Sequence, residues 1–578
     1  LFDFENRKGI FQNVHRSYKF SLLTIRGIKS NDKTNAKFAF FLHSTDDLKN
    51  EEKVFELDST DFELLNPNTR TCPIFRTRSD ADLTRKLYRK APVLVNEVTG
   101  ENPWGISFKQ GHFNMTSDSH LFHTKEQLES LGFKLQGNIF IKGSEVYLPL
   151  YEAKMFWFYD HRFGTYEGVV DRSDTHLHEI PSRDPDYYAL PWYWVSGNDW
   201  KLTIPQEYYL AFRNVTNVTN ERSAVSAILP MVAIGHSAPF LIFNIRGFEA
   251  LLLANISSFT FDYLSRQKIG GVNLTFHYVK QLPVYPKNKY TQQLIDHFLI
   301  KVLELVYTSF DLYPFFEKQF QSLSPETRKY LLDQWRNEDL MVNRSRIDSS
   351  YLNIYGLLQL DNNKTKEIEI RYPFSWDEER RFQLRCDLDA LFGHLYNLTR
   401  DEFAYILETF PIVRRKDEAQ YGEYRTKRVI LEKFDALADD PMLMGACTPL
   451  AERVSVLSPS AQPILPDSEP ELDEAEEYAA QPEPELVDGE EPAEQLEPVP
   501  AQPEAAAEPE PPAAPAAVPA AEEQQSLPFN SQADSPIISD YTLYRCPICD
   551  KHILGFDLER HTREVHLGKD PGYKKIRK

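Results

Sequence analysis

The spacing of apolar and polar residues along the chain changes character near residue 290. Before that point, apolar residues gather in short runs of strand length that are separated by polar turns. The expected strands cover residues 19–25, 36–42, 138–141 and 240–243. Residues 80–88 predict a helix, because Leu83 and Leu87 stand four apart and acidic residues precede basic ones, as the helix dipole favours. The pattern indicates an α+β region over residues 1–288.

From residue 290 onwards the apolar residues follow a helical repeat. Leu294, Phe298, Val302 and Val306 recur every four residues and predict an amphipathic helix. A pair of helices is expected at 387–396 and 400–407, interrupted at Asn397-Leu398-Thr399, with a further helix at 428–437. Residues 289–454 therefore read as a mostly α-helical domain.

Residues 455–540 differ in composition from the rest of the chain. Of its 38 prolines, 15 lie between residues 461 and 530, and no Lys or Arg occurs from 455 to 544. Such a segment buries too little apolar area to offset chain entropy, so we expect a disordered linker that is rich in Pro, Ala and Glu.

The net charge of -21 comes from this linker, because 21 Asp and Glu lie between residues 455 and 544. Residues 545–578 carry nine basic and five acidic residues, which leaves residues 1–454 close to neutral. The overall acidity therefore does not exclude a nucleic acid as partner.

The composition also bears on the cellular compartment. No run of 18 apolar residues exists, so we expect no membrane partner. Leu1–Lys8 lacks the order of a signal peptide, and Cys72, Cys386 and Cys447 stand alone rather than in a disulfide framework. A cytoplasmic protein is expected.

Four residues near the C-terminus have the spacing of a zinc site: Cys546, Cys549, His561 and His566. Two thiolates and two imidazoles complete a tetrahedral shell, so the zinc is expected to be structural, with no open position for a substrate. Residues 541–578 are therefore predicted to form a small ββα zinc finger. Its basic tail suits phosphate contacts, but a single finger can equally bind protein, and the sequence leaves this choice open.

Several stretches of the first 450 residues resemble one known family. They are residues 11–20, 65–76, 148–155, 159–163, 281–283, 395–398 and 421–428, together with the most telling one, Asp262-Tyr263-Leu264-Ser265-Arg266-Gln267-Lys268-Ile269-Gly270-Gly271-Val272-Asn273-Leu274. They resemble the C-terminal half of large adenine-specific DNA methyltransferases of the type IIG restriction-modification kind.

The resemblance implies that residues 1–288 form a target-recognition domain, which holds double-stranded DNA while the target adenine is flipped out. The family's catalytic parts, a glycine-containing loop for S-adenosylmethionine and an Asn-Pro-Pro-Tyr-type motif, are not found in this sequence. The nearest string, Asp184-Pro185-Asp186-Tyr187, lacks the second proline. The chain begins with Leu rather than Met, so we expect the S-adenosylmethionine domain upstream of residue 1.

The resemblance also implies a role in bacterial restriction-modification or phage defence, in the bacterial cytoplasm. No catalytic residue is assigned to this chain, which is expected to be inactive alone. Its expected partners are double-stranded DNA and an upstream methyltransferase domain or subunit.

Nine residues are candidates for DNA contacts, by resemblance and by residue type: Lys154, His161, Arg162, Arg213, Arg222, Arg266, Gln267, Lys268 and Asn273. Arginine can bond guanine bidentately, whereas lysine and asparagine more often contact phosphate or adenine. The turn at Gly270-Gly271 would let the backbone approach a phosphate closely. For each residue the alternative is a surface charge or a structural ion pair.

Three other interpretations compete with the main one. Glu152-Ala153-Lys154 matches the Glu-x-Lys end of a magnesium nuclease triad, although no convincing Pro-Asp partner precedes it. The chain could instead be a non-enzymatic specificity subunit of a separately encoded methyltransferase. It could also be a protein-interaction scaffold that has lost DNA binding and docks through its zinc finger.

Overall fold

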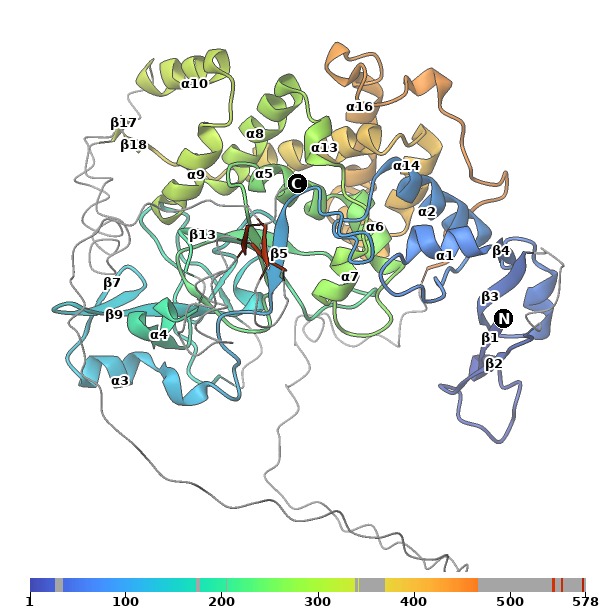
Figure 1. Ribbon diagram of the computed structural model, residues 1–578, viewed down its shortest axis with the longest axis horizontal. Coiled ribbons are helices and arrows are strands. Elements are labelled where there is room, and N and C mark those ends of the chain that lie inside the picture. The colour runs from blue at the N-terminus through green and yellow to red at the C-terminus, as the bar shows by residue number, and fades with distance from the viewer. Residues whose placement is uncertain are drawn as a thin grey trace, which may run out of the picture. The chain divides into compact units, whose positions relative to one another are not determined.

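The chain divides into two compact units, residues 1–487 and 488–578, which are described separately. The computed structural model in Figure 1 describes residues 1–25, 35–172, 177–203, 205–337, 341–342, 370–465, 543–545, 552–554 and 574–575. The first unit contains nearly all of the described elements, including a small strand pair formed by β17 (Met341–Val342) and β18 (Ile370–Arg371).

The first unit begins with a four-stranded sheet in the order β2-β1-β3-β4. Its strands are β1 (Phe2–Glu5), β2 (Lys19–Leu22), β3 (Ala36–Leu42) and β4 (Phe55–Leu57). β1 runs antiparallel to β2 and parallel to β3. Because β2 stands at the end of the strand order, it is an edge strand. The strands predicted at 19–25 and 36–42 are confirmed as β2 and β3.

Two capped helices follow this sheet. Asp58 caps α1 (Ser59–Leu65), and Thr77 caps α2 (Arg78–Lys90), each through a side-chain oxygen that accepts from backbone N–H groups. The helix predicted at 80–88 is confirmed as the centre of α2.

Two further sheets form the middle of the unit. One has the order β14-β13-β16-β5, and the other has the path β6-β12-β9-β8-β7, with β15 pairing parallel to β9. The first comprises β5 (Ile106–Lys109), β13 (Tyr208–Phe212), β14 (Ser226–Pro230) and β16 (Phe240–Phe243). The second comprises β6 (Phe122–His123), β7 (Lys134–Gln136), β8 (Ile139–Lys142), β9 (Glu145–Tyr151), β12 (Trp194–Ser196) and β15 (Ala233–Ile234). The strands predicted at 138–141 and 240–243 are confirmed as β8 and β16.

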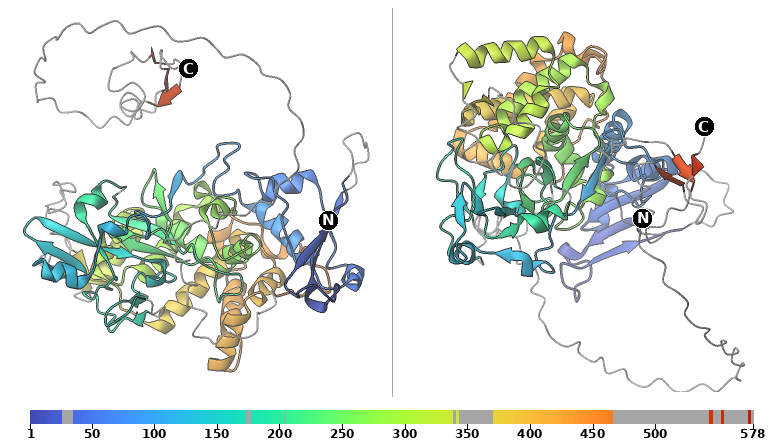
Figure 2. Two further views of the ribbon diagram at one scale, coloured as in Figure 1. Left: turned by 90° about the horizontal axis from the view of Figure 1, so that it is seen from below. Right: turned by 60° about the vertical axis from the view of Figure 1, so that its left-hand side comes forward.

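Short elements border these sheets: α3 (Lys125–Ser130), α4 (Gly197–Lys201), and the strand pair β10 (Gly164–Thr165) and β11 (His178–Glu179). Figure 2 shows the N-terminal sheet and the β7–β9 sheet at opposite ends of the unit, with helices between them.

The chain then becomes helical. The next helices are α5 (Glu249–Ser257), α6 (Phe259–Arg266), α7 (Phe276–Lys280), α8 (Gln292–Val306), α9 (Tyr313–Phe320) and α10 (Pro325–Asn337). They are followed by α13 (Glu378–Leu395), α14 (Arg400–Glu408), α15 (Pro411–Tyr421) and α16 (Arg425–Ala436). The predicted helix pair is confirmed as α13 and α14, and a capping box of Thr399 and Glu402 starts the second helix.

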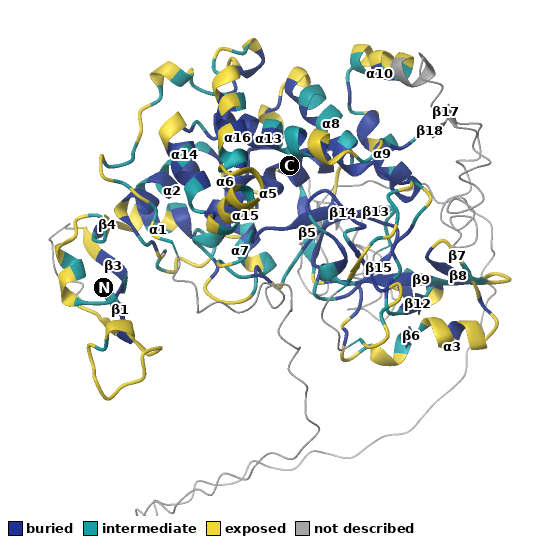
Figure 3. Cartoon of the chain, turned by 180° about the vertical axis from the view of Figure 1, so that it is seen from behind, coloured by how far each residue is buried: buried dark blue, intermediate teal, exposed yellow. Residues whose placement is uncertain are grey.

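The described structure thus confirms an α+β region followed by a mostly helical region, but the two share one core. A single cluster of buried apolar residues runs from Phe38 to Ala446. Asn255 in α5 donates to the Tyr396 hydroxyl (2.9 Å), and the Phe259 amide donates to Asp389 in α13 (2.7 Å). The single core therefore continues across the predicted boundary at 288/289, and the helical part already begins before it, with α5. Figure 3 shows buried residues continuing through both regions.

The ordered part extends further than predicted. Residues 455–465, which we expected in the disordered linker, are described, and Val456, Leu457 and Ala461 pack against the main core. Ser458 lies 3.2 Å from Ser79 at the start of α2. The reason is local composition, because these apolar residues precede the run of acidic residues.

The second unit is described only in three strands, β19 (Leu543–Arg545), β20 (His552–Leu554) and β21 (Lys574–Lys575), which form an antiparallel sheet in the order β20-β19-β21. The predicted zinc ligands Cys546, Cys549, His561 and His566 lie outside the described residues, as does the linker from residue 466. Within the described residues, no helix is long and apolar enough to cross a membrane.

Candidate nucleic-acid interface

The first predicted cluster of DNA contacts lies inside the fold. His161 is buried, and its Nε2 lies 3.1 Å from both carboxylate oxygens of Asp311 and 3.1 Å from Ser309 Oγ. Arg162 has no exposed surface, and its guanidinium donates to the carbonyls of Asp184 (2.8 Å), Tyr187 (2.9 Å) and Thr308 (3.0 Å). Burial lowers the pKa of Arg162. These two side chains tie the loops on both sides of β10 and β11 to the segment before α9.

The Ser309, His161 and Asp311 cluster does not have the geometry of a catalytic triad. In a triad the nucleophile and the orienting carboxylate contact different ring nitrogens of the histidine. Here both partners lie at Nε2, and Ser309 also donates directly to Asp311. All three side chains are buried, so a substrate could not reach them.

The second and third predicted clusters meet around one buried carboxylate. Arg222 donates to Asp262 Oδ2 (2.6 Å) and to the Ser257 carbonyl (2.7 Å). Arg266 donates to the carbonyls of Asn220 (2.6 Å) and Glu221 (2.9 Å), and its guanidinium lies over the ring of Phe410 (4.2 Å). The two arginines connect the loop before β14 to α6.

Lys268 is also directed inward. Its ammonium donates to the Leu65 carbonyl and to Asn66 Oδ1, and it lies 5.2 Å from the centre of the Tyr88 ring. Burial lowers the pKa of Lys268 to about 7.

Five of the nine candidates thus have partners inside the fold: His161, Arg162, Arg222, Arg266 and Lys268. Sequence shows the charge of a side chain but not its direction, and each of these side chains already has internal partners. A side chain held in this way would have to leave them before it could contact DNA.

Lys154 and Arg213 are half-buried, and the cationic group of each lies over an aromatic ring. Lys154 Nζ lies 4.9 Å from the centre of the Tyr166 ring, whose hydroxyl donates to Glu152 (2.8 Å). The guanidinium of Arg213 donates to the Phe156 carbonyl (3.0 Å) and lies over the Trp157 ring (4.6 Å). Glu152 and Lys154 therefore stand in an aromatic setting, and no group of three His, Cys, Asp or Glu side chains within the described ranges could hold a metal ion.

Gln267 and Asn273 have a different setting, because four loops come together around them. We define the loop face as residues 66–71, 95–101, 214–220 and 267–277. The Thr216 amide donates to the Val272 carbonyl (2.9 Å), and the Leu274 amide donates to the Asn214 carbonyl (2.7 Å). Asn68 donates to the Val95 carbonyl (2.9 Å).

The loop face is therefore a connected surface, although its segments lie up to about two hundred residues apart. The contacts of Lys268 with the end of α1 connect the first and last segments of this face. In Figure 1 the last of these segments connects α6 to α7. The loop at 66–71 lies in one stretch of the family resemblance, 65–76, but gave no candidate for a DNA contact, and the loop at 95–101 had no sequence signal.

The chemistry of the loop face is mainly that of amides and hydroxyls. Gln267 and Asn273 are half-exposed, and Thr69, Thr71, Thr99 and Thr219 are exposed. A side chain added at Gly270 or Gly271 would meet no atom within 4 Å, so another backbone or a phosphate could approach this turn closely. Glu97 and Glu101 reduce the positive charge of the face.

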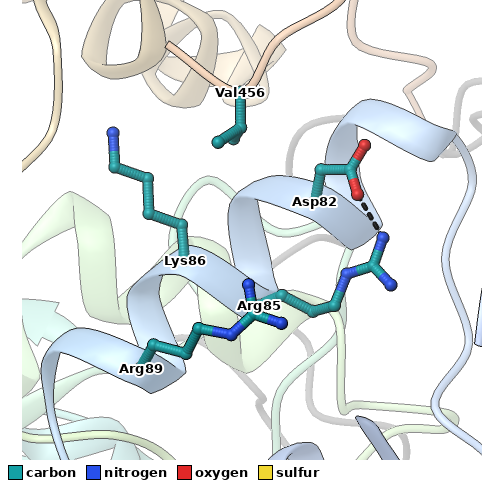
Figure 4. A pocket seen from close by; sticks show the side chains of 5 residues that line it. All are labelled: Asp82, Arg85, Lys86, Arg89 and Val456. Carbon is teal, nitrogen blue, oxygen red and sulfur yellow. Dashed lines mark hydrogen bonds and ion pairs between the residues drawn. The ribbon is translucent and has the colours of Figure 1, made fainter. Parts of the chain in front are cut away.

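A second polar surface lies along α2. A hollow of about 420 Å³ is lined by Asp82, Arg85, Lys86, Arg89 and Val456 (Figure 4). Arg85 is paired with Asp82 and with Asp61 (3.0 Å), and Lys86 is paired with Glu402 (2.5 Å). Arg89 is exposed and has no ion pair with any residue that the structure describes. Because two of its three cations are already compensated, this hollow is a weaker anion site than its composition suggests.

Comparison with family models, with curated proteins and with solved structures finds no match to this chain.

Proposed function

We propose that this chain recognises double-stranded DNA in a sequence-specific manner on behalf of an adenine-specific DNA methyltransferase, in bacterial restriction-modification or phage defence. The catalytic S-adenosylmethionine domain would be supplied by an upstream domain or by a separate subunit. The proposal rests on the sequence resemblance, and one structural observation supports it. The stretch of strongest resemblance, 262–274, ends in the exposed turn of the loop face.

The loop face suits base recognition better than non-specific attraction. Amide side chains such as those of Gln267 and Asn273 can bond the adenine edge bidentately. Because the face carries little net charge, phosphate contacts have to come from elsewhere. The basic C-terminal residues Lys569 to Lys578 belong to the predicted zinc finger and would supply them under this proposal. Zinc would have a structural role there, with Cys546, Cys549, His561 and His566 as ligands.

A binding experiment with the full chain tests this assignment. Gln267→Ala and Asn273→Ala are each expected to weaken binding to the preferred duplex by about 1–3 kcal/mol, which is roughly 5- to 150-fold. Their effect on a random duplex should be small, because base contacts contribute little to non-specific binding. The preferred sequence would first be selected from a random duplex library, and affinities would be measured over a salt titration.

Asn288→Ala is the matched control, because Asn288 is an exposed amide outside the loop face. It should leave both affinities unchanged. If the full chain showed no affinity for any duplex at low salt, the scaffold interpretation would replace the proposal. If all three variants lost the same amount of affinity for the preferred duplex, the loop face would be excluded as the surface that contacts the bases.

A further inference from the structure

The N-terminal hairpin exposes large apolar side chains in a short stretch of sequence. They are Ile10, Phe11, Val14, Tyr18, Leu22, Leu23 and Ile25, with exposed fractions from 37% to 79%. We call these residues, together with Arg7, Lys8, Arg16 and Lys19, the hairpin surface. Figure 3 shows the exposed loop beside β1. Contiguous exposed apolar residues mark interaction sites, and an open edge strand such as β2 is commonly covered.

The same surface carries a positive charge. Residues 6–25 include four basic residues and no acidic one. Glu5 pairs with Arg7 and Lys19, both at 2.9 Å. Arg16 donates to the Arg7 carbonyl (2.8 Å), and neither Arg16 nor Lys8 has an ion pair with any residue in the described ranges. The surface therefore fits a partner that combines carboxylates with apolar side chains.

The described part of the first unit ends at Leu465, next to this surface. Ile464 and Leu465 line a hollow together with Phe40, Phe41 and Arg76 of the N-terminal region. Two cations lie over the ring of Phe41: the guanidinium of Arg76 is 4.0 Å from the ring centre, and Lys19 Nζ is 5.7 Å from it. Leu465, the last described residue before the acidic segment, therefore lies within a few side chains of Lys19.

The segment that follows has the required chemistry. Residues 466–487 contain nine acidic residues and no basic one. They also contain Leu472, Tyr478, Leu486 and Val487. A chain of this length can extend to about 70 Å, so reach is not limiting. A short tether gives an effective concentration on the order of mM, which is enough for weak binding sites to be occupied.

We propose that the acidic segment 466–487 binds to the hairpin surface of its own chain, with its carboxylates near Lys8, Arg16 and Lys19 and its apolar side chains against the exposed apolar residues. The proposal goes beyond the function proposed above and does not depend on it. Its consequence is that any other anionic or apolar partner of the hairpin surface has to displace this segment.

Hydrogen exchange of the full chain tests the proposal without DNA. In one variant the nine acids of 466–487 are replaced by Gln or Asn, and in the matched control nine acids of 488–522 are replaced in the same way. Amides of residues 8–18 are expected to exchange about three- to tenfold faster in the first variant than in the wild type, because a covering segment slows opening. The control should exchange like the wild type, and about 0.5 M salt should make the wild type exchange like the first variant.

Lys8→Gln with Arg16→Gln gives a second measurement from the surface side. In this double variant, replacing the acids of 466–487 should no longer change the exchange rate of residues 8–18. In the control Lys134→Gln with Lys329→Gln, which changes two exposed lysines elsewhere, the same replacement should still speed exchange. The proposal would be overturned if the amides of residues 8–18 exchanged at the same rate in the wild type and in both variants whose acids are replaced. Protection that depends on protein concentration would assign the surface to a second copy, and protection seen only with added duplex would assign it to DNA; either result also overturns it.

Discussion

Arg162 and Arg70 show how differently two arginines of one chain are used. Arg162 is buried and holds three backbone carbonyls, whereas Arg70 is exposed and faces Glu63 at 3.6 Å. A buried charge that loses its partners costs several kcal/mol, but an exposed ion pair contributes about 0–1 kcal/mol. Both arginines lie in stretches of the family resemblance, so neither the resemblance nor residue type alone could separate these two uses.

His394 leads to a prediction about pH. The ring is buried and stacked on Phe434 with 4.0 Å between centroids; its Nε2 donates to the Phe434 carbonyl (2.8 Å), and its Nδ1 accepts from Arg453 (3.0 Å). Burial lowers the pKa of His394 to about 4, from an ordinary value of 6.5. The unfolded chain therefore takes up the proton first as pH falls, so the stability from neutral His394 is complete above pH 6.5 and is lost towards pH 4.

When the pH is lowered from 7.5 to 5, His394 should lower the free energy of unfolding of the wild type by about 2 kcal/mol. His394→Gln should remove that part of the pH dependence, measured from denaturant midpoints at both pH values. His120→Gln, at an exposed histidine, should keep the wild-type dependence. A pH dependence that is the same in all three proteins would show that His394 titrates normally.

At the scale of elements, the helical region depends on close packing at Gly393. This glycine lies in α13, and a Cβ built there would stand 2.8 Å from Phe403 and 3.1 Å from Phe434. Both rings are fully buried and lie 5.4 Å apart between centroids, so neither can move aside easily. The glycine therefore sets the distance between α13, α14 and α16.

Gly393→Ala should accordingly destabilise the first unit by about 1–3 kcal/mol, although alanine favours a helix by about 1 kcal/mol. Chemical denaturation followed by circular dichroism would measure the change. Gly270→Ala is the control, because its Cβ would meet no atom within 4 Å, and it should change stability by less than about 0.5 kcal/mol. A stabilising Gly393→Ala would mean that the two rings have room to move.

At the scale of the whole molecule, the two compact units separate the predicted metal site from the large core. Cys72 and Cys386 belong to the first unit, and burial raises the pKa of the Cys72 thiol to about 11 and that of Cys386 further. No group of three His, Cys, Asp or Glu side chains among the described residues could hold a metal ion, so these two cysteines are not expected to bind zinc.

The full chain is therefore expected to hold one zinc ion, bound by Cys546, Cys549, His561 and His566. Cys546→Ser should remove it, as measured by atomic emission on protein purified without chelator, whereas Cys72→Ser should retain it. Since the site lies in the second unit, metal loss should leave the unfolding of the first unit within about 0.5 kcal/mol of the wild type. Full zinc content in Cys546→Ser would refute the predicted ligand set.

The sequence by itself determined the elements whose signals are local. Strands β3 and β16 and helices α2, α8 and α14 follow from apolar spacing and capping residues, because such spacing depends on the period of the element alone. Helix α5 could not be recognised in this way, since all its residues are buried and it has no polar face.

Only the tertiary structure decided which charged residues face solvent and which loops meet. Arg222 and Arg266 turn towards Asp262, and the four segments of the loop face are joined by hydrogen bonds between residues distant in sequence. The direction of a long side chain depends on its neighbours in space, so no local pattern encodes it. For the same reason, only the structure placed Ile464 and Leu465, which precede the acidic segment, beside Phe41 of the N-terminal sheet.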